Sequence, residues 1–285
     1  MTGKTDEKTR SSLMQRVITA VPLVILLIVA LAIGGWVLAV VVVACVGLAV
    51  YEELSALKQG GHRPVWWPSF AALIISAPLM MHYSYMGMIP VLLAMCLCIM
   101  LAVMKREQPE LTDILVSVLP LFSLVVPCMC LLGILDTQPR VLQSMLLIFV
   151  FTTSVGGDTF AYFVGRAVGG PKLCPHISPN KTIAGGIGGL AGSVGVTVLA
   201  GLIFQWAAPD FAGFPPLWAN ALAGLVGGVG AQLGDLFASL VKRHCKLKDF
   251  GHIFPGHGGM LDRLDSIVFT AIVIYCYRVI LLGLG

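Results

Sequence analysis

Three aspartates in one short, charged stretch have the types and spacing of a divalent-cation site. The stretch runs from residue 234 to 266 between segments that are otherwise almost wholly apolar, and it holds Asp235, Asp262 and Asp265. Asp262 and Asp265 are three residues apart, which places both carboxylates on one face of a helix. Such carboxylates repel each other unless a positive charge lies between them. Oxygen ligands of this kind suit a hard cation such as Mg²⁺, with phosphate oxygens completing its shell.

Structural roles are the alternative for the same aspartates. A carboxylate near a helix N-terminus is stabilised by the helix dipole, so capping alone explains one of Asp262 and Asp265. Asp235, Ser239 and Lys242 share a helical face, so an Asp235–Lys242 pair would account for Asp235. An aspartate at membrane depth costs about 2.5–3.5 kcal/mol, and we therefore expect a partner or a polar cavity beside it in either case.

A glycine-rich turn flanked by positive charge lies just before Asp262. The run from Pro255 to Gly259 leads into the next helix, and such a turn exposes backbone N–H groups to an anion. The basic residues around it are Lys242, Arg243, Lys246, Lys248 and Arg263. A polyphosphate is the expected occupant, with His257 as either a phosphate donor or a turn residue. Anchoring in the lipid headgroups is the alternative for the basic residues, but it does not explain aspartates at apolar borders.

A second polar cluster lies between residues 156 and 182. Asp158, Tyr162 and Arg166 fall on one helical stripe. Lys181 and Thr182 come directly before a glycine-rich apolar segment, so we expect them at a helix N-terminus, which is another anion site. The glycines of that segment are assigned to helix packing, because the GxxxxGK[ST] pattern is absent.

The elements that position these residues are predicted to be membrane-spanning helices. The 285 residues are 58% hydrophobic and 11% charged, with a mean hydropathy of +0.93, whereas soluble domains carry about 25% charged residues. Because a span takes roughly 20 apolar residues, we expect an all-α, polytopic bundle of about nine transmembrane helices. The expected spans are 17–33, 36–54, 66–82, 86–104, 112–134, 141–163, 183–206, 216–240 and 265–283. The eight cysteines are expected to be buried thiols.

The distribution of positive charge predicts the orientation of the bundle. With the N-terminus inside, all 18 Lys and Arg residues fall on the cytoplasmic side except Arg140 and Arg278. We therefore expect an integral membrane protein with its N-terminus and its charged loops, 164–182 and 241–264, in the cytoplasm. The membrane that we predict for it is the bacterial inner membrane. Glu52 and Glu53 end the second span, where they either face the bundle or are solvated.

The same pattern divides the chain into three parts. Residues 1–16 form a polar cytoplasmic tail, residues 17–140 form the N-terminal transmembrane helices, and residues 141–285 form a C-terminal catalytic region with its loops.

Taken together, the two polar clusters resemble the phosphatidate cytidylyltransferase family, also called CDP-diacylglycerol synthases. The C-terminal motif of that family is matched by Ser239, Lys242, Arg243, Lys248, Asp249, Gly251, Phe254, Pro255, His257, Gly258, Gly259, Asp262, Arg263 and Asp265. An earlier motif is matched by Gly156, Asp158, Thr159, Ala161, Tyr162, Gly165, Arg166, Ser178, Pro179, Lys181 and Thr182. Val155 departs from the family, which often has Trp there. The matched motifs cover about the C-terminal half.

The resemblance implies a reaction in which CTP and phosphatidic acid give CDP-diacylglycerol and pyrophosphate. It also implies Mg²⁺, and it suggests a second cation such as K⁺ and a homodimer. The implied catalytic residues are Asp235, Asp262, Asp265, Lys242 and Arg263, and the implied metal ligands are Asp235, Asp262 and Asp265. The implied substrate-binding residues are Asp158, Arg166, Lys181, Thr182, Ser239, Arg243, Lys248, Asp249, His257, Gly258 and Gly259. Membrane lipids are expected partners, and nucleic acid is not.

Two other functions fit parts of the pattern. A transporter or flippase for an anionic substrate would use intramembrane carboxylates as proton or cation sites. It predicts charges along a pore and repeated segments, whereas here the charge gathers on one side. A different lipid-linked transferase, such as a polyprenol kinase, is the third interpretation.

Overall fold

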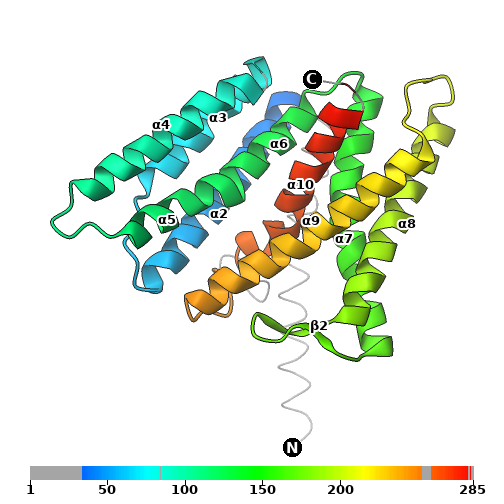
Figure 1. Ribbon diagram of the computed structural model, residues 1–285. Coiled ribbons are helices and arrows are strands. Elements are labelled where there is room, and N and C mark those ends of the chain that lie inside the picture. Colours follow the sequence, from blue (N-terminus) through cyan, green and yellow to red (C-terminus); the bar gives the residue numbers. More distant parts are fainter. Residues whose placement is uncertain (1–33, 84, 252–257, 282, 284–285) are drawn as a thin grey trace, which may run out of the picture.

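The protein is a bundle of long helices in which successive spans run in opposite directions (Figure 1), and Leu111–Leu135 forms one continuous span. The computed structural model describes residues 34–83, 85–251, 258–281 and 283. The helices are α2 (Gly35–Gln59), α3 (Trp67–Tyr83), α4 (Tyr85–Met104), α5 (Leu111–Pro120), the π-helix η1 (Leu121–Val125), α6 (Val126–Leu135), α7 (Arg140–Val168), α8 (Ile183–Ala207), α9 (Leu217–His244) and α10 (Leu261–Leu281). A short antiparallel ribbon, β1 (Lys172–Cys174) and β2 (Ser178–Thr182), joins α7 to α8.

The expected helical membrane bundle is confirmed, although the number of nine spans is not. Six helices of the described chain are long and apolar enough to cross a membrane. They are Gly35–Gln59, Gly87–Met104, Leu111–Leu135, Arg140–Val168, Ile183–Ala207 and Leu217–His244. The helices α3 and α10 occupy two further expected spans. The tail at 1–16 and the span expected at 17–33 lie outside the described residues.

The two expected cytoplasmic loops contain more regular structure than the sequence indicated. The segment 164–182 holds the last turn of α7 and the β-ribbon, and in the segment 241–264 α9 continues to His244 while α10 begins at Leu261. Long charged side chains at a helix end extend into water and so do not stop the helix. The end of α7 is set instead by Gly169, whose φ of 67° is in the region that glycine adopts readily.

The two halves of the bundle pack in different ways. The helices α2 to α6 enclose bulky apolar side chains, of which Leu54, Leu73 and Leu132 are fully buried. The helices α7, α8 and α9 approach one another through glycine. A Cβ at Gly224 of α9 would lie 2.8 Å from the backbone oxygen of Ser193 in α8, so only glycine fits at this crossing. The eight cysteines are free, as expected, but only Cys128, Cys130 and Cys245 are buried, and Cys276 is exposed.

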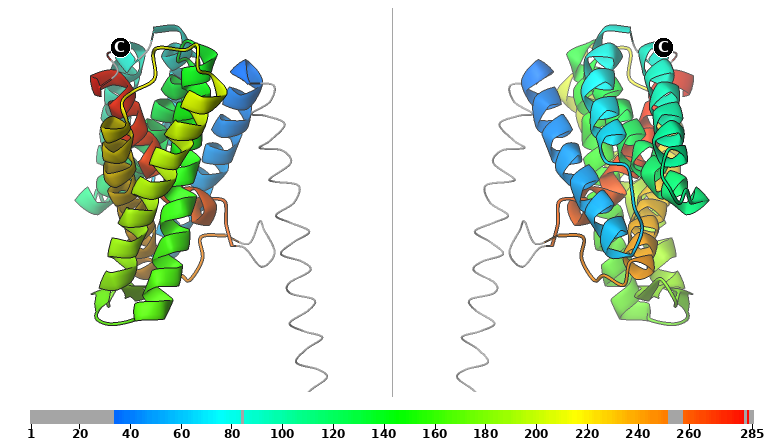
Figure 2. Two further views of the ribbon diagram at one scale, coloured as in Figure 1. Left: turned by 90° about the vertical axis from the view of Figure 1, so that its right-hand side faces the viewer. Right: turned by 90° about the vertical axis from the view of Figure 1, so that its left-hand side faces the viewer.

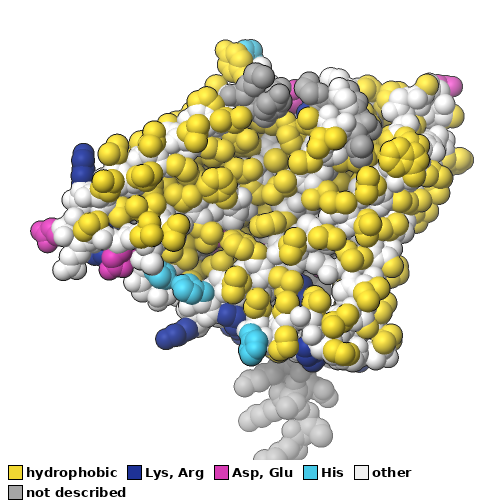
Figure 3. Space-filling model, in the orientation of Figure 1, with side chains coloured by type: hydrophobic (Ala, Val, Ile, Leu, Met, Phe, Trp, Pro, Cys, Tyr) yellow, Lys and Arg dark blue, Asp and Glu magenta, His cyan; other side chains and the backbone are white. Residues whose placement is uncertain are grey.

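Charge gathers at one end of the bundle. In the described chain, all Lys and Arg residues except Arg140 and Arg278 lie in a few connecting segments or in the helical turns next to them. These connecting segments are 60–66, 105–110, 169–182 and 245–260. We call this the charged end. Figure 2 shows the β-ribbon beneath the α7–α8 pair there. In Figure 3 a broad apolar surface covers the middle of the molecule, and Lys, Arg and His side chains appear along its lower edge.

A buried carboxylate holds two loops of the N-terminal half together at the charged end. Asp113 is 1% exposed, and it accepts hydrogen bonds from the Arg106 guanidinium at 2.6 Å and from the backbone N–H of Arg63 at 3.1 Å. The Arg63 side chain also pairs with it, at 3.3 Å. We call Asp113, Arg106 and Arg63 the clasp. It fixes the loop after α2 against the start of α5.

The glycine packing between α8 and α9 leads to a prediction about stability. We expect Gly224→Ala to lower the free energy of unfolding in detergent micelles by about 1–3 kcal/mol, because the added methyl group overpacks the helix crossing. The control is Gly195→Ala on α8, where a Cβ would meet no atom within 4 Å. Alanine there should be neutral or stabilising by up to about 1 kcal/mol, since it favours the helix. Equal effects of the two substitutions would contradict the packing.

Candidate functional site

Three carboxylates from three helices come together near the charged end. Asp158 lies on α7, Asp235 on α9 and Asp265 on α10, and Gly234, next to Asp235, packs closely against the backbone oxygen of Asp265. We call these three residues the acidic cluster. Ser266 connects two of the helices, because its hydroxyl donates to Asp158 at 3.4 Å and accepts from the hydroxyl of Ser154 at 2.8 Å. Net negative charge concentrated in this way is stabilised by a nearby positive charge or by protonation of one of the acids.

Lys181 supplies one positive charge to the acidic cluster. Its ammonium group forms an ion pair with Asp235. Lys181 lies on β2, and the next residue, Thr182, caps the N-terminus of α8, because the Thr182 hydroxyl accepts the N–H of Gly185 at 3.0 Å. The prediction that this pair of residues stands at a helix N-terminus is confirmed. The ribbon thus positions the positively charged side chain of Lys181 next to the carboxylate of Asp235 on α9.

Asp262 occupies a separate environment, although it lies on the same helix as Asp265. One carboxylate oxygen accepts from the ammonium group of Lys242 at 2.7 Å, and the other accepts from the N–H groups of Phe250 and Gly259, both at 3.0 Å. Its side chain is 7% exposed. These contacts give Asp262 the capping role that the sequence left open, while the metal-ligand role that the resemblance implied for Asp262 stays a prediction. The alternative Asp235–Lys242 pair is not formed, because each of these residues has another partner.

The glycine-rich turn before α10 binds carboxylates of the protein itself. The N–H of Gly259 is committed to Asp262, while the next two N–H groups, of Met260 and Leu261, donate to Glu52 on α2 at 3.0 and 2.8 Å. Gly258 has a φ of 81°, and a Cβ there would lie 2.9 Å from Asp262. These described donors are thus already paired, and His257 lies outside the described residues.

Glu52 and Glu53 are functional candidates that sequence reasoning left undecided. Both are buried, at 3% and 1% exposure. Glu53 accepts a hydrogen bond from the hydroxyl of Ser123 on η1 at 2.8 Å. One sequence feature could have indicated their burial: two adjacent acids end an apolar span in a chain that carries little charge. Which acids are buried depends on the packing of α2 against α10 and η1, and the local sequence does not specify that packing.

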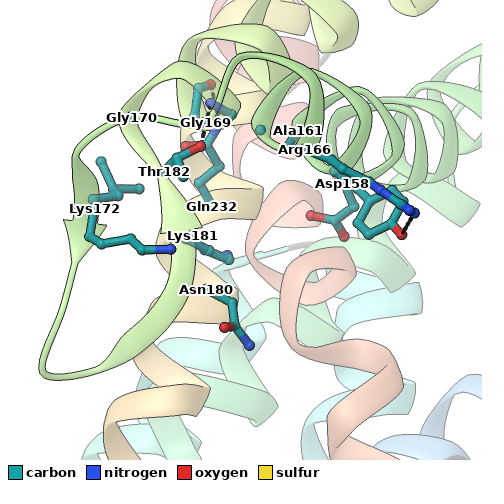
Figure 4. A pocket seen from close by; sticks show the side chains of 15 residues that line it. Asp158, Ala161, Arg166, Gly169, Gly170, Lys172, Asn180, Lys181, Thr182 and Gln232 are labelled. Atoms are coloured by element: carbon teal, nitrogen blue, oxygen red, sulfur yellow. Dashed lines mark hydrogen bonds between the residues drawn. The ribbon is translucent and has the colours of Figure 1, made fainter.

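A cavity of about 530 Å³ opens beside the acidic cluster (Figure 4). It lies between α7, the ribbon and the start of α8, with Gln232 of α9 on its wall. Cationic side chains line it from two elements, Arg166 on α7 and Lys172 and Lys181 on the ribbon. Its volume is within the range of about 300–1,000 Å³ for small-molecule sites. The cavity can accept an anion next to carboxylates that attract a cation.

The remaining described site residues lie at or near the charged end. Arg166 donates to the hydroxyl of Tyr162 at 3.0 Å, which keeps the predicted stripe of α7 together. Arg243 contacts the backbone oxygen of Ile177 at 3.4 Å, so it ties the end of α9 to the ribbon. Three others are exposed at the charged end, namely Lys248, Asp249 and Arg263, and Ser239 is half-buried on α9.

The donor chemistry of the acidic cluster suits Mg²⁺. Within the described residues, no three His, Cys, Asp or Glu side chains converge closely enough to hold a metal ion by themselves. Mg²⁺ does not need such a group, because it is usually bound by one or two carboxylates together with substrate phosphates and water. Asp235 and Asp265 provide carboxylates of this kind.

Comparison with known proteins identifies close similarities. A model described as the cytidylyltransferase family matches residues 14–281. The phosphatidate cytidylyltransferase of Brucella abortus (strain 2308) is 44% identical over 135 residues, 47% of each chain. That of Bacillus subtilis (strain 168) is 44% identical over 119 residues, 41% of each chain. Phosphatidate cytidylyltransferase 4, chloroplastic, of Arabidopsis thaliana is 30% identical over 273 residues, 86% of this chain and 68% of the relative. The chain spans about half the length of the curated bacterial relatives it matches.

The buried Lys242–Asp262 pair predicts a coupled effect on stability. We expect Asp262→Asn to lower the free energy of unfolding by about 3 kcal/mol, because it leaves Lys242 without its counter-charge in a largely buried position. Lys242→Met should cost less, since Asp262 keeps two backbone donors. The double variant should show a coupling energy of about 0.5–3 kcal/mol in a double-mutant cycle measured by unfolding in mixed micelles. The same cycle with the exposed Lys248→Met should be additive, and additivity in both cycles would refute the pair.

Proposed function

This chain belongs to the cytidylyltransferase family, and on that premise we propose that it catalyses the reaction of CTP with phosphatidic acid to give CDP-diacylglycerol and pyrophosphate. The relatives named phosphatidate cytidylyltransferase support the proposal. The observation that carries it is the meeting of the acidic cluster with a cationic cavity at one end of a membrane bundle, through the Lys181–Asp235 pair.

The position of the cavity fits one lipid substrate and one water-soluble substrate. Next to it, α7 and α8 expose large apolar side chains, among them Phe160, Phe163 and Ile187. These surfaces suit acyl chains, while Arg166 and Lys172 suit a phosphate group at the membrane border. The lipid can therefore present its phosphate to the charged end without leaving the bilayer, and CTP can approach from the water.

The chemistry requires little from the protein beyond positioning and charge. An oxygen of the lipid phosphate forms a bond to the α-phosphorus of CTP, and the bond from that phosphorus to the oxygen leading to the β-phosphate breaks, releasing pyrophosphate. The lipid phosphate is ionised at neutral pH, so it is itself the nucleophile. The obstacle is to bring two anions together, and cationic side chains reduce that repulsion.

Individual residues take separate parts in this scheme. Asp235 and Asp265 would hold Mg²⁺, which when bound supplies neutralising charge to phosphate oxygens, and Asp158 adds negative charge beside them. Lys181 joins the two regions, because it lines the cavity and also pairs with Asp235. Lys248 and Arg263, exposed at the charged end, would neutralise the triphosphate. A second cation such as K⁺ and a homodimer belong to the same proposal.

We place the charged end on the cytoplasmic side of a bacterial inner membrane. The support is the asymmetry of the described Lys and Arg residues, because positive charge in short loops is retained on the cytoplasmic side. The same asymmetry disfavours a transport pathway, which would require charged groups along the depth of the bundle.

Orientation can be tested by labelling from outside the cell. In a background without native cysteines, Asp210→Cys between α8 and α9 should react with a membrane-impermeant maleimide in intact bacterial cells. Lys248→Cys, at the charged end, should react only after the cells are permeabilised. Labelling of Lys248→Cys in intact cells would place the charged end outside.

The activity is tested by following CDP-diacylglycerol formation from radiolabelled CTP and phosphatidic acid in micelles. We expect product with Mg²⁺ and none with EDTA.

We expect Asp235→Asn to reduce turnover by about 100-fold or more, because several kcal/mol of charge stabilisation depend on the bound ion. Asp210→Asn, the same substitution at an exposed site on the opposite end, should leave turnover unchanged. No lipid product from the unmodified protein would refute the function, and equal turnover of the two variants would refute the role of Asp235.

A further inference from the structure

We infer that Glu52, a residue of α2 outside both sequence motifs, is a positioning residue for the acidic cluster. The structure assigns it the task of holding the first turn of α10, the helix that carries Asp265. The catalytic consequence rests on the proposed function, whereas the anchoring of α10 does not.

The contacts of Glu52 are those of a helix cap supplied from a distant part of the chain. One carboxylate oxygen accepts the N–H of Met260 at 3.0 Å, and the other accepts the N–H of Leu261 at 2.8 Å. The first N–H groups of a helix have no partner within it, and the helix dipole favours negative charge at this end. Hydrogen bonds from N–H groups to an ionised carboxylate are about twice as strong as neutral ones.

The surroundings of Glu52 leave no substitute for its carboxylate. Glu52 is 3% exposed, and Met260 and Leu261 are 6% and 5% exposed, so water has little access to these donors. A Cβ at Gly251 or at Gly259 would each lie 2.4 Å from an oxygen of Glu52. The two glycines therefore form a cradle that the carboxylate fills. This accounts for glycine at both positions without a phosphate ligand.

Glu52 influences the position of Asp265 through helix α10. Asp265 lies four residues after Leu261, about one turn further along the same face of α10. Because a helix moves as a stiff unit, a displacement of its first turn displaces Asp265 relative to Asp158 and Asp235. The second tie, from Lys242 of α9 to Asp262, constrains the same turn from another side. The N-terminal half thus contributes to the site through α2, and catalytic groups are sensitive to shifts of about 1 Å.

The first arm of the test measures anchoring without reference to activity. Hydrogen–deuterium exchange is recorded for the backbone amides of residues 259–264 in the full chain. Glu52→Gln replaces one oxygen by an NH₂ group that faces a backbone donor, and we expect exchange at Met260 and Leu261 to rise about tenfold or more. The control, Asp113→Asn, weakens the clasp in the same half and should leave this segment unchanged. Unchanged exchange in Glu52→Gln would overturn the inference.

The second arm measures positioning. Mn²⁺ binding, followed by electron paramagnetic resonance, should weaken about fivefold or more in Glu52→Gln and remain unchanged in Asp113→Asn. If the protein makes CDP-diacylglycerol, kcat should fall about tenfold, the Mg²⁺ concentration for half-maximal rate should rise, and KM for CTP should change little. Faster exchange with unaltered Mn²⁺ affinity would show that Glu52 only stabilises the fold, and the inference would fail.

The two proposals fail in distinguishable ways. An inactive unmodified protein would refute the enzymatic function, while the exchange and Mn²⁺ measurements would still decide the role of Glu52. If Glu52→Gln does not fold, Gly251→Ala serves as the second variant, because its methyl group would displace the same carboxylate. The same increases in amide exchange and loss of Mn²⁺ affinity are then expected, and their absence would overturn the inference.

Discussion

The binding of the α10 N-terminus by buried carboxylates is the interaction on which the arrangement of the site depends. Glu52 reaches this turn from α2, and Asp262 closes the loop that precedes it. A buried charge is costly unless it is paired or hydrogen-bonded. In a chain this apolar, each buried acid therefore fixes the elements that supply its partners. The orientation of Asp265 follows from these contacts.

The acidic cluster exists because the packing around it is of two kinds. Bulky side chains such as Leu54 and Leu132 fill the N-terminal half and give α2 a rigid base. Glycines such as Gly224 let α7, α8 and α9 approach closely, which brings carboxylates from separate helices together. Where α7 ends at Gly169, the ribbon turns back and leaves the cationic cavity. The site is thus formed at the point where close helix packing stops.

A membrane border is a suitable place for a reaction between a lipid and a nucleotide. The apolar surface of the bundle can remain among acyl chains (Figure 3), while the charged end meets water and phosphate groups. The ion pair of Lys181 with Asp235 lies at the boundary of these two environments.

The sequence by itself determined the membrane class, the helices from residue 35 onward, the segregation of charge and the two polar clusters, because these depend on composition and local periodicity. It also placed Thr182 at the start of α8. Only the tertiary structure decided the partners. Asp262 and Asp265 are three residues apart, yet one closes a loop with Lys242 and the other joins Asp158 and Asp235. The difference arises because hydrogen-bond partners for buried acids come from segments as far as 209 residues away, and spacing along one helix carries no information about them.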